Sequence, residues 1–377
     1  MNGANILAIG VGGGGGNALS SMVRLGMPGI HTVAANTDKQ ALDKNAAAEK
    51  LLLGNGLGAG GNPEVGRKAA IESQTALIQA VQGVDLVFVT AGMGGGTGTG
   101  AAPVVAEIAR RSGALTVGVV TRPFKFEGGK RGKQADAGLD RLLASVDSLI
   151  VVSNERLLEV CGEDVSMLDA FEKADRVLFD AVQGVAGLVQ DVGYINIDFA
   201  DLQSVMRHTG LALMGAGRAE GEGRVLKAVQ AAASSPLLDG VRLDGAHGLL
   251  VNFRAAQQLG LKEVNAAMTW LSGQAHDDAE IVFGAVIDES MGDAVAVTLV
   301  ATGFGQAGGP EPEQVSLPPT RRPSSPPAGS AAPQRRESDP PRLSLRPPLG
   351  TAGVFEADRL PNYPHPSDSR PPKRRDG

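Results

Sequence analysis

The chain has 377 residues and a formal net charge of −6 at pH 7, and this length fits two domains of ordinary size. A charge this close to neutral does not suggest nucleic-acid binding, and no apolar run reaches the roughly eighteen residues of a membrane span. Cys161 is the only cysteine and the first residues lack the basic start of a signal peptide, so we expect a reducing, cytoplasmic location without disulfides.

Short apolar runs alternate with helical patterns through the first half of the chain. The predicted strands are residues 6–9, 32–35, 86–90, 115–120 and 149–152. Such alternation is typical of a parallel sheet with helices on both of its faces. We therefore predict an α/β fold for this half.

A glycine-rich loop, residues 10–17 (GVGGGGGN), follows the first predicted strand and precedes a helical pattern from residue 18. Gly10, Gly12 and Gly15 satisfy the dinucleotide-binding pattern GxGxxG, and Asp38 stands near the position expected for a ribose-binding acid. Taken alone, this loop leaves a nicotinamide-dependent oxidoreductase open.

A second glycine loop, residues 92–100 (GMGGGTGTG), lies between the predicted strand 86–90 and a helical pattern at 101–109. Glycines let an anion approach the backbone N–H groups of a loop and of a helix start. A tight turn or flexible linker explains one such cluster equally well, but two clusters suit the longer polyphosphate of a nucleoside triphosphate. Neither loop contains GxxxxGK[ST], so charge neutralisation would depend on backbone N–H groups, helix N-termini and Mg²⁺.

The next part of the chain has a long helical pattern and no further glycine loop of this type. Its apolar stripe consists of Phe171, Leu178, Val182, Val185, Leu188 and Val189. A helix of this length can join two domains. After it we predict a helix at residues 224–233 and strands at 248–253, 281–287 and 294–302.

The last part of the chain differs in composition. Seventeen of the 22 prolines lie from Pro310 onward, where Phe355 and Tyr363 are the only aromatic residues. Such a segment buries too little apolar surface to offset its ordering entropy, so we predict that it is disordered.

Several segments together resemble the tubulin/FtsZ superfamily in the form of its bacterial cell-division GTPases, over about residues 6–302. These segments are the two glycine loops, ANTD at 35–38, GAGGNPEVGR at 58–67, TRPFKFEGGKR at 121–131, NIDFAD at 196–201 and SSPLL at 234–238. The resemblance implies a Rossmann-like GTPase domain, a long central helix and a second α+β domain. It also implies GTP or GDP as the ligand, with Mg²⁺, and hydrolysis of GTP to GDP and phosphate.

The resemblance divides the chain into five parts. We expect a GTP-binding domain at 1–167, a central connecting helix at 168–192, and an α+β domain with a catalytic loop at its start at 193–303. A disordered, proline-rich linker is expected at 304–354, and a partner-binding peptide with a basic end at 355–377.

The resemblance also assigns a nucleotide site, in which Glu127 contacts the ribose and Arg131 the phosphates; from sequence alone both are ordinary loop charges. The expected GTP-binding residues are Gly13, Gly14, Gly15, Gly16, Asn17, Asn36, Gly95, Gly96, Thr97, Gly98, Thr99, Glu127, Arg131, Asn154, Phe171 and Asp175.

Asp175 is the candidate for base recognition. Guanine presents its N1–H and N2 amino group as adjacent donors, which one carboxylate can accept together, whereas adenine lacks both. Asp175 lies four residues after Phe171, so both project from one helix face and the ring can stack on the base. A core Phe171 and a solvated Asp175 are the alternative. Asn154 is either a helix N-cap or, by the resemblance, a second guanine contact.

Residues 196–201 have two interpretations. They read as a helix start, with Asn196 or Asp198 as the cap and Asp201 in the first turn. By the resemblance Asp198, Asp201 and Asn196 are catalytic, since hydrolysis needs acidic groups to orient a water at the γ-phosphate, and they act on the nucleotide of the next subunit. A homologue that forms filaments without hydrolysis is the remaining alternative.

The resemblance finally implies partners and a place in the cell. The chain is expected to form a head-to-tail homopolymer with itself and to bind membrane-tethering division proteins through its C-terminal peptide, as well as division regulators. We expect it in the cytoplasm at the mid-cell division ring, without nucleic-acid partners and without a membrane span. The five scattered histidines and single cysteine give no metal-ligand spacing.

Overall fold

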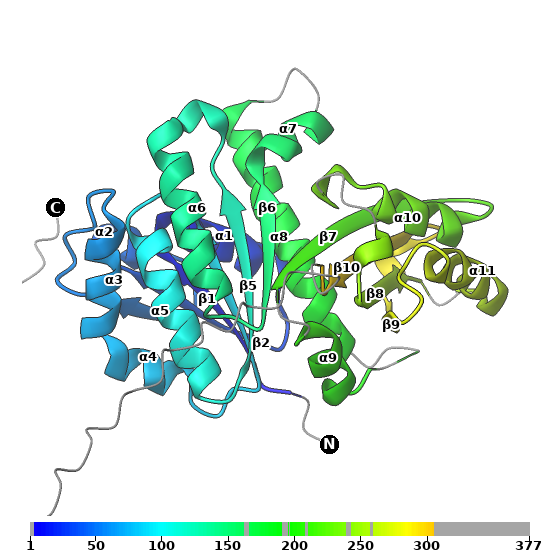
Figure 1. Cartoon of the computed structure of the whole chain (residues 1–377), viewed down its shortest axis with the longest axis horizontal. Coiled ribbons are helices and arrows are strands. Elements are labelled where there is room, and N and C mark those ends of the chain that lie inside the picture. The colour runs from blue at the N-terminus through cyan, green and yellow to red at the C-terminus, as the bar shows by residue number, and fades with distance from the viewer. Residues whose placement is uncertain are drawn as a thin grey trace, which may run out of the picture. The chain divides into compact units, whose positions relative to one another are not determined.

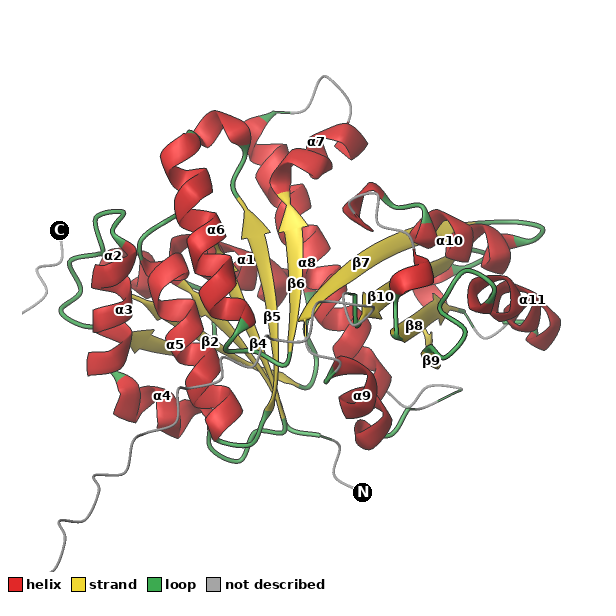
Figure 2. Cartoon of the chain, viewed as in Figure 1, coloured by secondary structure: helices red, strands yellow, loops and turns green. Residues whose placement is uncertain are grey.

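The computed structural model describes residues 4–161, 166–190, 195, 197–207, 210–238, 243–256 and 259–304, all within one compact unit, Met1–Gln314. In this part of the chain ten strands form a single sheet in the order β3-β2-β1-β4-β5-β6-β7-β10-β8-β9 (Figures 1 and 2). The predicted linker beyond Phe304 and the C-terminal peptide lie outside the described residues. None of the described helices combines the length and apolar character needed to span a bilayer.

The strands are β1 (Ile6–Val11), β2 (Ile30–Asn36), β3 (Glu49–Leu52), β4 (Leu86–Gly92), β5 (Leu115–Arg122), β6 (Ser148–Ser153), β7 (Gly210–Ala219), β8 (Gly248–Ala255), β9 (Glu280–Ile287) and β10 (Val295–Thr302). The helices are α1 (Gly12–Leu25), α2 (Lys39–Asp43), α3 (Pro63–Glu72), α4 (Gln74–Val81), α5 (Thr97–Arg111), α6 (Gly129–Leu143), α7 (Asn154–Cys161), α8 (Met167–Gln190), α9 (Phe199–Met206), α10 (Arg224–Ala233) and α11 (Leu261–Ser272).

The first six strands are all parallel to their neighbours, and their order, 3-2-1-4-5-6, is that of a Rossmann sheet. All five strands predicted for this half are present, so the α/β prediction is confirmed. Strand β3 was not predicted, because Glu49–Leu52 is short, lies at the sheet edge and has mostly exposed side chains. It therefore lacks the apolar run that marks a buried strand.

Each face of this sheet has its own apolar core, since successive strand residues point to opposite faces. Along β1, Ile6 and Ala8 belong to a core shared with α1 and α8, whereas Leu7 and Ile9 belong to a core shared with α4 and α5. Figure 1 shows α3 to α6 together over one face of the sheet. The predicted two-sided helical cover is thus confirmed.

Helix α8 (Met167–Gln190) is the predicted long helix. Its buried stripe, with Leu178, Val182 and Val185, lies in the same apolar core as Ile150 of β6 and Val300 of β10. One helix therefore packs against strands from both halves of the chain. Phe171, which we placed on this stripe, is 40% exposed and lies outside the core.

The second half completes the sheet and has a third apolar core, under α10 and α11. Strand β10 is antiparallel to β7 and β8, and β8 is parallel to β9. The predicted helix 224–233 and the three predicted strands are present. Strand β7 was not predicted because glycines interrupt it, but Cβ atoms at Gly215 and Gly217 would overlap carbonyl oxygens of α10. These glycines permit close packing rather than marking a loop.

Candidate functional site

The two glycine loops meet at one edge of the sheet. Strands β1 and β4 are parallel neighbours with Gly10 level with Thr90, so the segments that follow them leave the sheet side by side. A Cβ atom at Gly15 would overlap the carbonyl oxygen of Thr90. One at Gly12, whose φ is +74°, would lie 2.7 Å from the backbone nitrogen of Gly98. Only glycine permits these approaches, which bring two helix starts together.

Both glycine clusters extend into helices, which begin earlier than the sequence indicated. Helix α1 starts at Gly12 rather than Ala18, and α5 starts at Thr97 rather than Ala101. Gly12 begins α1 with a φ of +74°, and Gly15 in the same helix packs against the backbone of β4. The free N–H groups of both first turns thus lie at the same edge of the sheet, an arrangement that suits an anion.

A cavity of about 560 Å³ opens between these helix starts and α8. It is lined by twelve of the sixteen residues that we predicted for nucleotide binding. They are Gly13, Gly14, Asn17, Gly95, Gly96, Thr97, Gly98, Glu127, Arg131, Asn154, Phe171 and Asp175. Its size falls within the range of small-molecule sites.

Four predicted residues, Gly15, Gly16, Asn36 and Thr99, are not among the residues that line the cavity, and their contact with a nucleotide stays a prediction. Gly15 packs against β4. The carbonyl of Gly16 accepts a hydrogen bond from Asn45 Nδ2 (2.7 Å). Thr99 Oγ1 accepts one from the backbone N–H of Gly94 (2.8 Å). Asn36 is buried, and its side chain accepts one from the N–H of Asp38 (3.3 Å).

Asp175 and Phe171 lie on the wall that α8 contributes. The ring of Phe171 is edge-on to Phe124, with centroids 5.3 Å apart, and remains partly exposed, so it is not a core residue. Burial raises the pKa of Asp175, against the opposing effects of a hydrogen bond from Ser21 and the charge of Arg24. A partly desolvated carboxylate beside an available ring is not the ordinary solvated pair that the sequence left open.

Asn154, the first residue of α7, is only 4% exposed and lines the cavity. Its Oδ1 atom is buried and has no hydrogen-bond partner among the described residues. An unpaired buried acceptor costs about 1–3 kcal/mol. A ligand that donates a hydrogen bond here would remove that cost.

Glu127 and Arg131 also line the cavity and form an ion pair. Glu127 Oε1 also accepts a hydrogen bond from the backbone N–H of Phe124 (3.0 Å). The carboxylate is therefore held in place while the guanidinium, about half exposed, faces solvent and the cavity.

Sequence reasoning missed a polar face of α1 that lines the same cavity. Asn17 was predicted, but Ser20, Ser21 and Arg24 were not. These four residues follow the i, i+3, i+4, i+7 spacing of one helix face. That spacing of polar residues, starting inside the glycine loop, was the signal that could have identified them.

Asp198 and Asp201 lie elsewhere. Asp198 is the N-cap of α9, and its Oδ1 atom accepts a hydrogen bond from the backbone N–H of Asp201 (2.8 Å), so the helix-cap interpretation is confirmed. Neither residue lines the cavity. In Figure 2 the arrows of β5 and β6 point toward α7, whereas α9 lies near the opposite ends of these strands. Asn196 lies outside the described residues.

The described residues contain no group of three or more His, Cys, Asp or Glu side chains able to hold a metal ion. A Mg²⁺ ion beside the glycine loops would thus be coordinated mainly by phosphate oxygens and water, which is common for Mg²⁺ in nucleotide sites.

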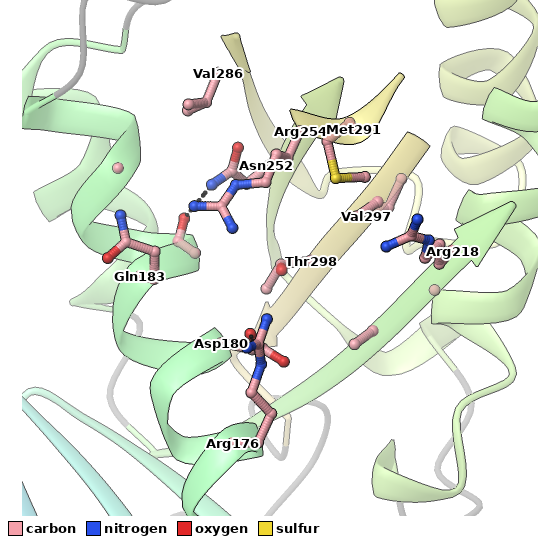
Figure 3. Close-up of a pocket in the computed structure, with 15 residues that line it drawn as sticks. Arg176, Asp180, Gln183, Arg218, Asn252, Arg254, Val286, Met291, Val297 and Thr298 are labelled. Atoms are coloured by element: carbon pink, nitrogen blue, oxygen red, sulfur yellow. Dashed lines mark hydrogen bonds and ion pairs between the residues drawn. The ribbon is translucent and has the colours of Figure 1, made fainter. Parts of the chain in front are cut away.

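A second cavity, of about 290 Å³, lies between α8 and strands β7, β8 and β10 (Figure 3). Arg176, Arg218 and Arg254 reach it from α8, β7 and β8. Arg176 Nε donates to Asp180 (3.2 Å), and burial raises the pKa of Asp180 although Arg176 and Arg254 oppose the shift.

The wall of this second cavity holds two buried amides. Asn252 Nδ2 donates a hydrogen bond to the carbonyl of Gly184 (2.8 Å) and so connects β8 to the backbone of α8. The oxygens Asn252 Oδ1 and Gln183 Oε1 have no partner among the described residues. The contact is close, since a Cβ at Gly184 would lie 2.6 Å from Thr298 Cγ2.

Comparison with known proteins identifies the family. The model of the Tubulin/FtsZ family GTPase domain matches residues 5–162, and that of the FtsZ family C-terminal domain matches residues 210–305. The structure of an empty FtsZ dimer from M. jannaschii is 45% identical, with a TM-score of 0.77, over 80% of this chain and 89% of that chain. The chain belongs to the FtsZ family. The same values hold for a tryptophan-to-tyrosine mutant of M. jannaschii FtsZ, with 92% of that chain covered.

More distant structures share the fold of this FtsZ-family chain. A GTPγS-bound protofilament of CetZ2 from Haloferax volcanii has a TM-score of 0.69 at 22% identity, over 80% of this chain and 94% of that chain. A GDP-bound CetZ1 monomer from the same organism has the same TM-score at 24% identity, with 95% of that chain covered. For this chain the FtsZ-type GTPase domain implies GTP or GDP as the ligand, which disfavours the nicotinamide-dependent oxidoreductase.

Proposed function

We propose that this chain is a self-assembling GTPase that binds GTP in the 560 Å³ cavity and hydrolyses it at a head-to-tail contact between two copies. The observation that carries the proposal is the separation of the two sets of residues. The cavity joins both glycine loops to Asp175, whereas Asp198 and Asp201 lie outside it, at the N-cap and in the first turn of α9.

The chemistry of the cavity fits a guanine nucleotide. The N–H groups of the two helix starts bind the phosphates, with Arg131 beside them and Mg²⁺ carried on the phosphate oxygens. Asp175 accepts the N1–H and N2 donors of guanine, Phe171 stacks on the base, Glu127 contacts the ribose and Asn154 is a further base contact. Adenine has neither donor, so Asp175 would make no hydrogen bond to the base, at a cost of about 1–3 kcal/mol.

Hydrolysis then needs a second subunit. Asp198 and Asp201, with Asn196, orient the attacking water at the γ-phosphate of the neighbouring copy. Such a contact uses two different surfaces of the chain, so its repetition without closure gives a filament. The FtsZ dimer and the CetZ2 protofilament among the similar structures are consistent with self-association.

The proposed domain boundaries and cellular location are based on the family to which the chain belongs. Residues 1–167, 168–192 and 193–303 form the GTP-binding domain, the connecting helix and the α+β domain. Residues 304–354 are the linker, and 355–377 bind membrane-tethering division proteins. We place the protein in the cytoplasm at the bacterial mid-cell ring, where regulators act on it.

One experiment tests the proposed function. GTP should drive sedimentation of the purified full chain, with phosphate released in parallel, whereas ATP and NADH should do neither. The Asp175→Ala substitution should weaken the binding of GTP and GDP more than that of the other nucleotides. Equal binding of ATP, or NADH binding tighter than GTP, would overturn the proposal, and sedimentation without phosphate release would favour a non-hydrolysing homologue.

A further inference from the structure

A hydrogen-bonded chain of three side chains connects α1 to the base end of the cavity. Arg24 Nη2 donates to Ser21 Oγ (2.9 Å), and Ser21 Oγ donates to Asp175 Oδ2 (2.8 Å). All three residues line the cavity. Because the serine hydroxyl has a single proton, its donation to Asp175 and its acceptance from Arg24 fix the direction of both hydrogen bonds.

This series of hydrogen bonds acts on Asp175, one of the two carboxylates that α8 contributes to the cavity; the other is Glu172. Hydrogen bonding to Ser21 restricts rotation of the Asp175 carboxyl group, while each of its oxygens keeps a lone pair for another donor. Two adjacent donors on a flat base can be accepted together only if the carboxyl plane is aligned with the base. The hydroxyl of Ser21 supplies that alignment before the ligand arrives.

The charges around Asp175 determine whether it is ionised. Burial raises its pKa, and Glu172 on the same helix raises it further, whereas Ser21 and Arg24 of α1 lower it. Glu127 and Arg131, which line the same cavity, are paired with each other. A bound base would exclude more water, so the contribution of Ser21 and Arg24 becomes more important in the complex.

We propose that Ser21, with Arg24 behind it, is a positioning residue for Asp175 and determines how strongly the site prefers guanine over bases that lack one or both of its donors. This inference rests on the proposed function. In this role the hydroxyl of Ser21 aligns the carboxylate of Asp175. Part of the selectivity for the base then comes from α1, outside the glycine loops.

The test compares Ser21→Ala, Ser21→Thr and Arg24→Gln with the unmodified chain. Titration calorimetry with GDP and with IDP, whose base lacks the N2 amino group, measures affinity and selectivity from pH 5.5 to 8. Ser21→Ala should weaken GDP binding by about tenfold, since a hydrogen bond to a charged group is lost. IDP should be weakened less, so the preference for GDP shrinks.

The pH profile separates positioning from a packing role. In Ser21→Ala the pKa of Asp175, followed by carboxyl NMR, should rise, and the loss of GDP affinity should be larger at pH 5.5 than at pH 8. Arg24→Gln should change the pKa of Asp175 and the GDP affinity in the same direction, but by less. Ser21→Thr, which keeps the hydroxyl, should bind GDP as the unmodified chain does. Ser112→Ala is the matched control, because that hydroxyl donates to a helix carbonyl, Ile108 O (2.9 Å), outside the cavity.

Two outcomes are distinguishable. If the unmodified chain does not bind GDP, the proposed function fails. If it binds GDP and depends on Asp175, while Ser21→Ala keeps its affinity, its GDP preference and its pH profile, then the proposed function stands and the role of Ser21 is wrong.

Discussion

The carboxylate of Asp198 accepts a hydrogen bond from the backbone N–H of Asp201 across the first turn of α9, at 2.8 Å. Asp198 therefore has a structural role in its own subunit in addition to the catalytic role proposed for it in the next. Any test of catalysis has to preserve the first role while removing the second.

Asp198→Asn meets this requirement, because asparagine caps helices as well as aspartate does but has no charge. We expect it to bind GTP and assemble, with phosphate release about a hundredfold slower and longer-lived filaments. Asp198→Ala should in addition lose about 1 kcal/mol of unfolding free energy. Phosphate release, sedimentation and chemical denaturation give the three readouts. Wild-type turnover by Asp198→Asn would exclude a catalytic carboxylate at this position.

The phosphate loop offers a clean site for blocking the nucleotide. A Cβ at Gly95 meets no atom within 4 Å, whereas one at Gly96 would lie 2.8 Å from Ala59 Cβ and 2.9 Å from Asn62 N. Gly95→Asp should thus fold normally and fail to bind GTP, because its carboxylate repels the phosphates. Gly95→Asn, of the same shape without the charge, is the control and should retain more affinity.

Mixing the two kinds of variant tests the shared site. An Asp198→Asn subunit supplies bound GTP, and a Gly95→Asp neighbour supplies the acidic residues, so a mixture should recover part of the turnover that each lacks alone. Phosphate release by dilute wild-type protein should also rise more steeply than linearly with concentration. Strictly proportional turnover, together with no recovery in mixtures, would place the acids and their nucleotide in one subunit.

Two carboxyl groups near the second cavity, those of Asp180 and Asp288, should have opposite effects on the pH dependence of folding stability. The pKa of Asp180 is raised above 3.8, mainly by burial, so the folded state holds this proton more tightly and its contribution to stability falls as pH rises through the raised pKa. The pKa of Asp288 is lowered below 3.8, mainly by a hydrogen bond from Ser290. Its contribution is present above 3.8 and is lost as pH falls through the lowered pKa.

Chemical denaturation between pH 3 and 7 checks these signs. As pH rises from about 4, the stability of Asp180→Asn should increase relative to that of wild type. As pH rises through the acidic end of the range, the stability of Asp288→Asn should decrease relative to that of wild type. Parallel pH curves for the two variants would show that the carboxyl environments differ from those described.

Gly184 of α8 packs closely against Thr298 of β10 beside the second cavity. Gly184→Ala would bring its Cβ to 2.6 Å from Thr298 Cγ2, so we expect a loss of about 1–3 kcal/mol in unfolding free energy. Thr298→Ser removes that methyl group. The double variant should recover roughly 1 kcal/mol relative to the sum of the single effects. Additive effects would mean that the clash is relieved elsewhere.

The sequence predicted those parts of the fold that depend on apolar periodicity. The buried parallel strands and α10 have unbroken patterns, and a stripe of apolar residues marks α8. Strand β3 was missed because its side chains are mostly exposed, and β7 because Gly215 and Gly217 permit contact with α10. In both cases the deciding contact is with a neighbouring element, β2 for β3 and α10 for β7, which the pattern within the strand itself does not record.

The candidate site divides in the same way. Residues with a recognisable pattern, such as the glycine loops or Phe171 with Asp175, were found and lie around one cavity. Ser21 was missed because a single serine on a helix has no distinctive pattern; its importance comes from the 2.8 Å hydrogen bond to a residue 154 positions later. Gly15 and Thr99 also have local contacts that the sequence did not predict, Gly15 with the backbone of β4 and Thr99 with the N–H of Gly94.

The close packing at the glycine loops has a consequence for mutational tolerance. Gly10 and Gly98 face backbone atoms that a Cβ would approach to 2.6 and 2.5 Å, whereas Gly13 and Gly95 face open space. Under selection for folding alone, substitutions should accumulate at the second pair and be absent from the first. Under selection for nucleotide turnover both pairs should stay glycine, so sequencing a randomised library under the two regimes would separate the glycines needed by the backbone from those needed by the ligand.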